Sequence, residues 1–235
     1  MGVTMEEFIG KVTSIENYKV NGELNAQSIR LLPEKKLDFK PGQYMLLAKE
    51  GFSLRARPSE LKWSSYSIAS SPKEKELEFA YTIRWSGGFT QHLAETLKEG
   101  SQLQLKGPFG NFFLKQNQRE NLLIATGAGI TPIMSMLRTL VPQKAPCTLY
   151  YGFRTSEHCF FQEELKELAN LPFLRLFFAT SREGDRCYVQ DLLKAAALPQ
   201  EAEAYICGNP KMVKEVRDLL LEKGLPQERI NAEQW

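Results

Sequence analysis

The chain has 235 residues, which is enough for one or two domains that each enclose a hydrophobic core. Its 43% hydrophobic and 25% charged residues are ordinary for a soluble globular protein. The net charge of +2, from 30 basic and 28 acidic residues, argues against a dedicated nucleic-acid-binding protein, which would carry a basic excess.

Residues 1–116 are expected to form an antiparallel β-barrel of short strands. The predicted strands are alternating or β-rich runs, and they cover 8–15, 28–32, 43–47, 65–69 and 78–83. Turn signals such as Asn21-Gly22 and Pro41-Gly42 separate them. One short helix is expected over 90–97. Regular short strands of this kind are typical of a barrel.

From residue 117 onward the pattern changes to strands that alternate with helices. The predicted strands cover 122–125, 147–152, 173–179, 204–207 and 229–233. Helices are expected to start at Pro132, to follow Ser156 as a cap, to cover 188–197, and to run from Asn209-Pro210 to Gly224. This alternation predicts a doubly wound parallel sheet, so the expected domains are 1–116 and 117–235.

A glycine turn, Gly-Ala-Gly-Ile-Thr-Pro at 127–132, joins a predicted strand to a predicted helix. Glycines let the backbone approach a pyrophosphate, and a helix N-terminus offers N–H groups and a positive dipole end. Thr131 is expected to cap that helix, with Pro132 as its first residue. No acidic residue follows about 20 residues on to hold a ribose, so the adenosine must be held elsewhere. Tight packing alone is the other explanation of such glycines.

The four cysteines are scattered, and none has iron–sulfur or zinc spacing. This favours free thiols in a reducing compartment. His92 and His158 have no ligand neighbours, so we expect them to be structural and expect no metal site. No apolar run reaches membrane-spanning length, and the first residues lack a signal-peptide pattern. We therefore expect a cytoplasmic protein that neither enters membranes nor binds nucleic acid.

Several further motifs, in chain order, resemble those of the ferredoxin–NADP(+) reductase family. They are Lys-Pro-Gly-Gln-Tyr at 40–44, Ser-Ser-Tyr-Ser at 64–67, Gly-Gly-Phe-Thr at 87–90, Gly-Pro-Phe-Gly at 107–110, Tyr-Ile-Cys-Gly at 205–208 and Glu-Gln-Trp at 233–235. The resemblance covers nearly the whole chain. It implies a single-chain flavoprotein without an iron–sulfur domain, in which an FAD-binding barrel precedes an NADP(H)-binding α/β domain.

The resemblance also implies where the flavin binds. Tyr66 would stack on the flavin or form a hydrogen bond near its ribityl chain. Ser67 would lie near N5, and the backbone at 88–90 would hold the pyrophosphate. The predicted flavin contacts are Ser64, Tyr66, Ser67, Tyr81, Gly88, Phe89 and Thr90.

One position departs from the family pattern. Ser64 stands where the family's Arg-x-Tyr-Ser motif has its arginine, and a serine carries no charge. Another cation is expected to neutralise the flavin phosphates, with Arg84 as the first candidate. The other candidates are Arg55, Arg57 and Lys62. Without such a cation the flavin would bind weakly, or it would be FMN.

Residues 180–190 follow the third strand of the second domain, where a doubly wound sheet receives the adenosine. A 2′-phosphate needs cationic forks and hydroxyl donors, and this segment supplies both, so it predicts NADPH rather than NADH. A solvated polar loop is the alternative. The predicted nucleotide contacts are Gly127, Gly129, Thr131, Pro132, Arg154, Ser181, Arg182, Arg186 and Tyr188.

The resemblance implies a hydride-transfer site of Ser67, Cys207, Glu233 and Trp235. Cys207 would lie beside the nicotinamide, and Glu233 would orient it or deliver protons. Trp235 would cover the flavin; stacking on an adenine or packing on a neighbour in the core are the alternatives. The expected reaction is hydride transfer from NADPH to FAD and release of single electrons from a monomer to an external ferredoxin or flavodoxin. The alternatives are the reductase component of an oxygenase, a flavin reductase, and a flavin-binding subunit of a larger complex.

Overall fold

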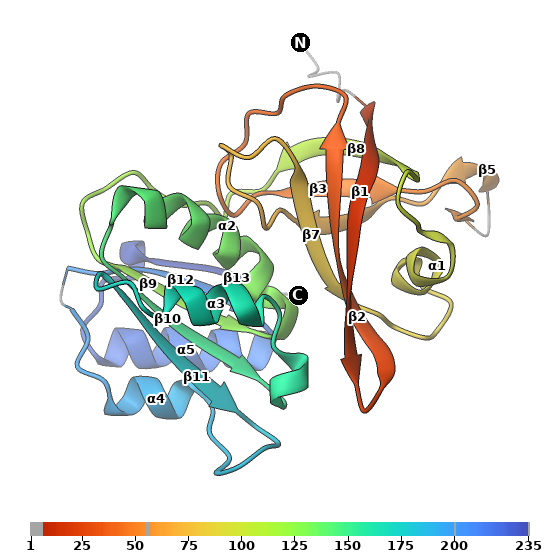
Figure 1. Cartoon of the computed structure of the whole chain (residues 1–235). Coiled ribbons are helices and arrows are strands. Elements are labelled where there is room, and N and C mark those ends of the chain that lie inside the picture. The colour runs from red at the N-terminus through yellow and green to blue at the C-terminus, as the bar shows by residue number, and fades with distance from the viewer. Residues whose placement is uncertain (1–6, 55–56, 200, 235) are drawn as a thin grey trace. The chain divides into compact units, whose positions relative to one another are not determined.

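The computed structural model describes residues 7–54, 57–199 and 201–234. The chain divides into two compact units, Met1–Phe113 and Leu114–Trp235 (Figure 1). The sequence places this boundary at 116/117, a few residues later. No helix in these described ranges is both long and apolar enough to cross a membrane.

The first unit is an antiparallel sheet of six strands in the order β6-β3-β8-β1-β2-β7. Its strands are β1 (Glu7–Val20), β2 (Glu23–Pro33), β3 (Tyr44–Ala48), β6 (Ser64–Ser67), β7 (Leu77–Thr82) and β8 (Gln102–Phe109). The end strands β6 and β7 approach each other, so the sheet curls into the expected barrel. A small hairpin of β4 (Ser53–Leu54) and β5 (Arg57–Leu61) and the helix α1 (Phe89–Thr96) are added to it.

A tight turn at Asn21-Gly22 fixes the register of the longest hairpin, β1–β2. Both residues have positive φ, 52° and 81°, as a type I′ turn requires. Val20 therefore pairs with Glu23. Alternate positions along the strands then face one core. The fully buried side chains of this core include Ile29, Leu31, Leu47, Phe79 and Leu105.

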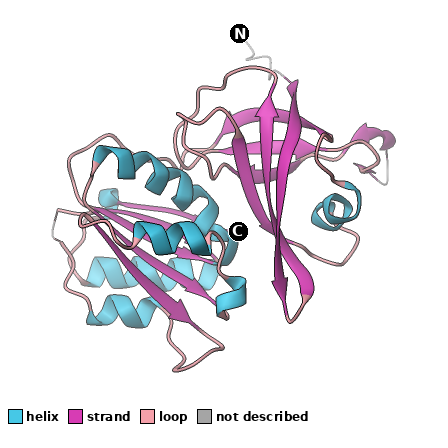
Figure 2. Cartoon of the chain, in the orientation of Figure 1, coloured by secondary structure: helices cyan, strands magenta, loops and turns pink. Residues whose placement is uncertain are grey.

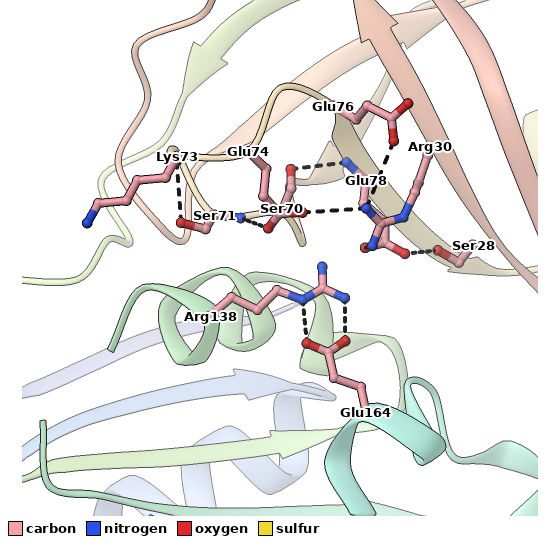
Figure 3. A network of polar contacts seen from close by, with 10 residues as sticks. All are labelled: Ser28, Arg30, Ser70, Ser71, Lys73, Glu74, Glu76, Glu78, Arg138 and Glu164. Atoms are coloured by element: carbon pink, nitrogen blue, oxygen red, sulfur yellow. Dashed lines mark hydrogen bonds and ion pairs between the residues drawn. The ribbon is translucent and has the colours of Figure 1, made fainter. Parts of the chain in front are cut away.

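A charged network ties β2 to β7 and to the loop before β7 (Figure 3). The Glu78 carboxylate is buried, and it accepts hydrogen bonds from Ser28 Oγ at 2.8 Å and from Arg30 Nη2 at 2.9 Å. Arg30 also forms ion pairs with Glu74 and Glu76, at 3.5 and 4.0 Å. A buried carboxylate is tolerated only when it is paired in this way, so the network is structural.

The second unit is a parallel sheet in the order β11-β10-β9-β12-β13 with helices on both faces (Figure 1; Figure 2). Its strands are β9 (Asn121–Thr126), β10 (Cys147–Phe153), β11 (Leu174–Thr180), β12 (Glu203–Gly208) and β13 (Ile230–Gln234). Helices α2 (Ile130–Leu140) and α3 (Gln162–Leu168) cover one face, and α4 (Val189–Ala195) and α5 (Pro210–Glu222) cover the other. This confirms the predicted doubly wound domain.

The boundaries of α5 follow its capping residues. Asn209 caps α5, since its side chain accepts a hydrogen bond from Met212 N at 2.9 Å, and Gly224 follows that helix with a φ of 88°. On the other face, Arg138 of α2 binds Glu164 of α3 through two hydrogen bonds, at 2.8 and 2.6 Å (Figure 3). The Arg138–Glu164 pair thus fixes α2 to α3.

Two predicted helix starts are wrong. Helix α2 begins at Ile130, because a 3-10 turn at Gly127–Gly129 lets the chain turn helical earlier; Thr131 Oγ donates to Ala128 O at 2.8 Å instead of capping the helix. Pro132 is therefore the third helical residue. Ser156 begins only a short 3-10 turn, and α3 does not start until Gln162.

Candidate functional site

Ser67 presents a buried hydroxyl that nothing in the described part of the chain satisfies. The residue is 2% exposed, and its Oγ has no hydrogen-bond partner there. It ends β6, opposite Tyr44 of β3. An unsatisfied buried hydroxyl costs roughly 1–3 kcal/mol, so this atom is suited to a hydrogen bond from a bound group. The orphaned hydroxyl fits the flavin edge that the sequence assigns to it.

Tyr66 lies beside it in sequence, with its ring packed among other aromatic rings. The ring meets Tyr81 edge-on at 5.5 Å and lies 6.0 Å from Phe89. Burial raises the pKa of Tyr66 well above its ordinary value, and the nearby positive charge of Arg84 partly opposes that rise. Tyr81 is buried and donates its hydroxyl proton to Gln27 Oε1 at 3.1 Å. Tyr81 thus supports Tyr66, and its own contact with a cofactor stays a prediction.

The loop from Arg84 to Thr90 is fixed by its own hydrogen bonds. Arg84 N donates to Thr90 Oγ1 at 3.0 Å, and Gly87 N donates to Gln91 Oε1 at 2.9 Å. Helix α1 begins just after Gly88, and no side chain caps it. The first N–H groups of a helix have no partner within the helix. Such N–H groups can bind an anion.

Open space surrounds the two glycines of this loop. A Cβ placed on Gly87 would meet nothing within 4 Å, and one on Gly88 would meet only Arg84 O at 3.9 Å. Gly87 also has a φ of 76°, which disfavours side chains. The loop therefore leaves room for a phosphate group close to the backbone.

The candidate cations differ in their surroundings. Arg84 is exposed, and within the described ranges its guanidinium forms no hydrogen bond or ion pair. Lys62 is also exposed, with Nζ 5.4 Å from the centre of the Phe52 ring. Arg55 and the side chain of Arg57 lie outside the described residues. Ser64 is partly buried at the start of β6, so its contact with a cofactor stays a prediction.

In the second unit, the glycine turn follows β9 at the point where the strand order reverses. Strand β9 lies between β10 and β12, and ligands of doubly wound sheets bind outside the carboxyl ends of the strands at such a point. Gly127 has a φ of 54°, and a Cβ added to it would meet nothing within 4 Å. A Cβ on Gly129 would instead collide with the Cys207 carbonyl of β12. Gly127 suits a close ligand, whereas Gly129 is required by packing.

The loops after β10 and β11 carry the predicted 2′-phosphate residues and lie side by side. Ser181 N donates to Phe153 O at 3.0 Å, and Arg182 N donates to Arg154 O at 2.8 Å. Arg154, Arg182 and Arg186 are exposed, and in the described part of the chain their guanidinium groups form no ion pair. Three arginines without an ion-pair partner in the described part of the chain are suited to bind a phosphate dianion.

The pKa of His158 responds to the positive charges on these loops. Burial lowers its pKa, and the charges of Arg154 and Arg182 lower it further, against a weaker opposing effect of Glu157. The sequence predicts only a structural role for His158, and no signal in the sequence places it beside two arginines. Tyr188 precedes α4 with 54% of its surface exposed, so its ring is open to stacking.

The predicted hydride-site residues of the second unit lie at the ends of β12 and β13. Cys207 is fully buried and pairs with both Ala125 of β9 and Glu233 of β13. Burial raises the pKa of Glu233 to about 7, and its Oε2 has no hydrogen-bond partner in the described part of the chain. Trp235 lies outside the described residues.

Comparison with known families finds two matches. An oxidoreductase FAD-binding domain matches residues 11–114, and an oxidoreductase NAD-binding domain matches residues 123–218. The fold is shared with the ferredoxin reductase in carbazole 1,9a-dioxygenase, at 25% identity and a TM-score of 0.81 over 100% of this chain and 70% of that one. It is also shared with ferredoxin-NADP+ reductase from Plasmodium falciparum, at 20% identity and a TM-score of 0.84 over 98% and 97%.

Two sequence relatives are longer than this chain. The reductase component (ferredoxin–NAD(P)(+)) of the naphthalene 1,2-dioxygenase system of Pseudomonas putida is 31% identical over 87% of this chain and 63% of its own length. Methane monooxygenase component C of Methylosinus trichosporium is 33% identical over 68% of this chain and 47% of its own length. This chain thus spans about half to two thirds of these relatives.

Proposed function

Because this chain belongs to the ferredoxin–NADP(+) reductase family and carries its FAD-binding and NAD-binding domains, we propose that it takes hydride from NADPH and passes electrons singly to a separate protein. When bound, FAD supplies the step from a two-electron donor to one-electron acceptors. The chain supplies binding, orientation and electrostatics. The NADPH preference rests on Arg154, Arg182 and Arg186. These arginines lie on the loops after β10 and β11, are exposed and form no ion pair within the described ranges.

Residues of the first unit would hold the flavin. The Ser67 hydroxyl supplies a hydrogen bond at the flavin edge, which removes the cost of its unsatisfied burial. Tyr66 offers a ring and a protonated hydroxyl, and burial raises the pKa of that hydroxyl further above its ordinary value. The N–H groups at the start of α1 bind phosphate.

Residues of the second unit would select and orient the nucleotide. Gly127 admits the pyrophosphate, and Arg154, Arg182 and Arg186 neutralise the 2′-phosphate. The same segment also carries the acids Glu183 and Asp185, and the Glu183 carboxylate is turned toward Ser156, from whose N and Oγ it accepts hydrogen bonds at 2.6 and 3.2 Å. The NADPH preference is therefore supported by the three arginines alone.

The acceptor is inferred from the relatives. The naphthalene dioxygenase relative is named as a reductase of ferredoxin, which supports a ferredoxin or flavodoxin as acceptor. The name of the methane monooxygenase relative favours a second candidate, in which the chain serves an oxygenase component directly. A monomeric state and a cytoplasmic location stay predictions.

Anaerobic stopped-flow reduction of the FAD-loaded chain tests the proposal. NADPH should reduce the flavin with a higher kcat/KM than NADH. The double substitution Arg182→Gln and Arg186→Gln should lower the NADPH/NADH ratio about tenfold or more, because each charged hydrogen bond is worth roughly 1.5–3 kcal/mol. Arg217→Gln, an exposed residue of α5 in the same unit, is the control. An unchanged ratio would rule out the 2′-phosphate assignment.

The acceptor is tested separately, by mixing the NADPH-reduced chain with candidate proteins. Rapid oxidation by a [2Fe–2S] ferredoxin or a flavodoxin supports the first candidate. Rapid oxidation only by an oxygenase component supports the second. Turnover with free FMN alone would identify a flavin reductase, and absence of flavin reduction by free NADPH would identify an electron-transfer subunit.

A further inference from the structure

Tyr151 of β10 joins the loops that follow two neighbouring strands, β9 and β10. Its hydroxyl oxygen lies 3.2 Å from Gly127 O and 3.3 Å from Phe160 N. Gly127 begins the turn after β9, and Phe160 lies in the segment between β10 and α3. The proposed function assigns the pyrophosphate to the first of these loops and, through Arg154, the 2′-phosphate to the second. One side chain thus contacts both loops.

We propose that Tyr151 is a positioning residue of the dinucleotide site: its hydroxyl group holds the Gly127–Ala128 peptide so that the Ala128 N–H faces the pyrophosphate. This inference rests on the nucleotide binding proposed above. It adds a fully buried residue that acts through the backbone of the glycine turn and not through contact with the nucleotide.

Tyr151 is held in place by its surroundings in the second unit. It pairs with Ala125 of β9, two residues before the glycine turn, and its ring meets Phe153 edge-on with centroids 5.1 Å apart. Tyr150, the residue before it, packs in the core that includes residues of α4 and α5. Because successive side chains of a strand point to opposite faces, Tyr151 points to the face covered by α2 (Figure 1). The glycine turn leads into that helix.

The direction of each hydrogen bond follows from its partners. The Phe160 N–H can only donate, and the Gly127 carbonyl can only accept. The Tyr151 hydroxyl group therefore accepts from Phe160 N and donates its single proton to Gly127 O. Gly127 O also accepts a hydrogen bond from Ile130 N at the start of α2. Two donors thus hold this carbonyl oxygen.

The orientation of this carbonyl also fixes the N–H of the same peptide. The Gly127–Ala128 peptide is trans, and the carbonyl and N–H of a planar trans peptide point in opposite directions. Because Gly127 O points at the buried Tyr151 hydroxyl group, the Ala128 N–H points away from it. This N–H belongs to the first turn of the helical segment that leads into α2, so it has no partner within the helix and can bind an anion.

The glycine does not fix this peptide by itself. Gly127 has a φ of 54°, and a residue without a Cβ can adopt many backbone conformations. A Cβ on Gly127 would meet nothing within 4 Å, so neighbouring side chains do not restrain the turn at this position. The Tyr151 hydroxyl group supplies that restraint. Without it the peptide can rotate, and the Ala128 N–H is no longer directed at the pyrophosphate.

The experiment is a calorimetric titration of the FAD-loaded chain with NADP+, NAD+ and 2′-AMP. Tyr151→Phe removes only the hydroxyl group, and it should raise the dissociation constants of NADP+ and NAD+ equally, about three- to tenfold, because both carry the pyrophosphate. The dissociation constant of 2′-AMP, which has a 2′-phosphate and no pyrophosphate, should stay unchanged. The limiting rate of flavin reduction at saturating NADPH, measured by stopped flow, should also stay unchanged.

Tyr150→Phe is the matched control. Tyr150 is also buried and lies next to Tyr151 on β10, but its ring stacks on Phe177 with centroids 4.9 Å apart. Within the described ranges its hydroxyl group forms no hydrogen bond. This variant should therefore keep all three dissociation constants of the wild type.

Several outcomes would overturn the inference. They are unchanged constants for NADP+ and NAD+ in Tyr151→Phe, an equal loss for 2′-AMP, or a loss as large in Tyr150→Phe. If Tyr151→Phe fails to fold, amide hydrogen exchange of the wild-type chain decides. NAD+ should slow exchange of the Phe160 N–H, because the Tyr151 hydroxyl group links it to the glycine turn, and an unchanged rate contradicts that link. Failure of the wild-type chain to bind either dinucleotide would instead overturn the proposed function itself.

Discussion

Cys207 and Glu233 are direct partners in the register of the parallel strands β12 and β13. Cys207 is fully buried, and the Glu233 carboxyl has an oxygen that no group in the described part of the chain satisfies. Burial raises the pKa of Glu233 to about 7, so this carboxyl changes charge within the physiological range. Such a group can both hold and release a proton near neutral pH.

Glu233 should make the folded chain less stable as the pH rises, which is opposite to the usual effect of a paired carboxylate. Its pKa is higher in the folded chain than the ordinary value of 4.5, so its contribution is fully present below that value and is lost as the pH rises through about 7. Glu233→Gln should remove this loss. Thermal unfolding from pH 5 to pH 8.5 measures it, with Glu222→Gln, an exposed residue of α5, as the control. Parallel Tm curves for wild type and Glu233→Gln would contradict the prediction.

Ser67→Ala should separate binding from folding. In the apoprotein the substitution removes an unsatisfied hydroxyl, so the free energy of unfolding should stay unchanged or rise by about 1 kcal/mol. In the FAD-loaded protein, reduction by NADPH should slow. Ser70→Ala is the control, since Ser70 Oγ accepts Glu78 N at 3.1 Å and its loss should destabilise the apoprotein. Urea unfolding and stopped-flow absorbance are the measurements.

Gly129→Ala should destabilise the chain by about 1–3 kcal/mol, because the added methyl group meets the backbone of β12 at Cys207. The φ of Gly129 is −61°, so the cost comes from contact and not from backbone strain. Gly88→Ala is the control, with a φ of −83° and no neighbour closer than 3.9 Å. Equal urea midpoints for the two variants would show that β12 yields to the methyl group.

His158 should give binding of the 2′-phosphate a pH dependence. Thr155 Oγ1 lies 2.8 Å from His158 Nδ1, and Arg154, Arg182 and Glu157 are the charges that act on the ring. Burial and the two arginines lower the pKa of His158, and a bound phosphate opposes that shift. Wild type should therefore gain affinity for 2′,5′-ADP, relative to His158→Gln, as the pH falls below about 6.5.

Calorimetric titration at pH 6 and pH 8 measures this difference. His92→Gln is the matched control, because His92 lies in the first unit and stacks on Phe52. An identical change of affinity with pH in wild type and His158→Gln would show that the ring does not sense the phosphate. Protonation of the phosphate itself is common to both proteins and cancels in the comparison.

Elements bounded by turn or capping residues could be predicted from the sequence. The Asn21-Gly22 turn and the Asn209-Pro210 cap each require a particular residue, so both were located correctly. Strand β8 is not among the predicted strands, although Leu103 and Leu105 alternate with polar residues, because it contains Gly107 and Pro108, which are typical of turns. The β4–β5 hairpin carries no alternation and gave no signal.

The site was less predictable, because its properties depend on distant contacts. Both glycines of the 127–129 turn look alike in sequence, and only the position of β12 shows that Gly129 is needed for packing. The raised pKa of Glu233 likewise follows from burial that no local pattern reveals.

The strand order places the loops proposed to bind the adenosine and the strands proposed to carry the hydride site on opposite sides of β9. Arg154, Arg182 and Arg186, on the loops after β10 and β11, are exposed, whereas the turn after β9 packs against the end of β12 at Gly129. Under the proposed function, the choice between NADPH and NADH would depend on exposed residues and the hydride site on buried ones. Substitutions that favour NADH could then be made in the loops after β10 and β11 without disturbing the packing of β9 against β12.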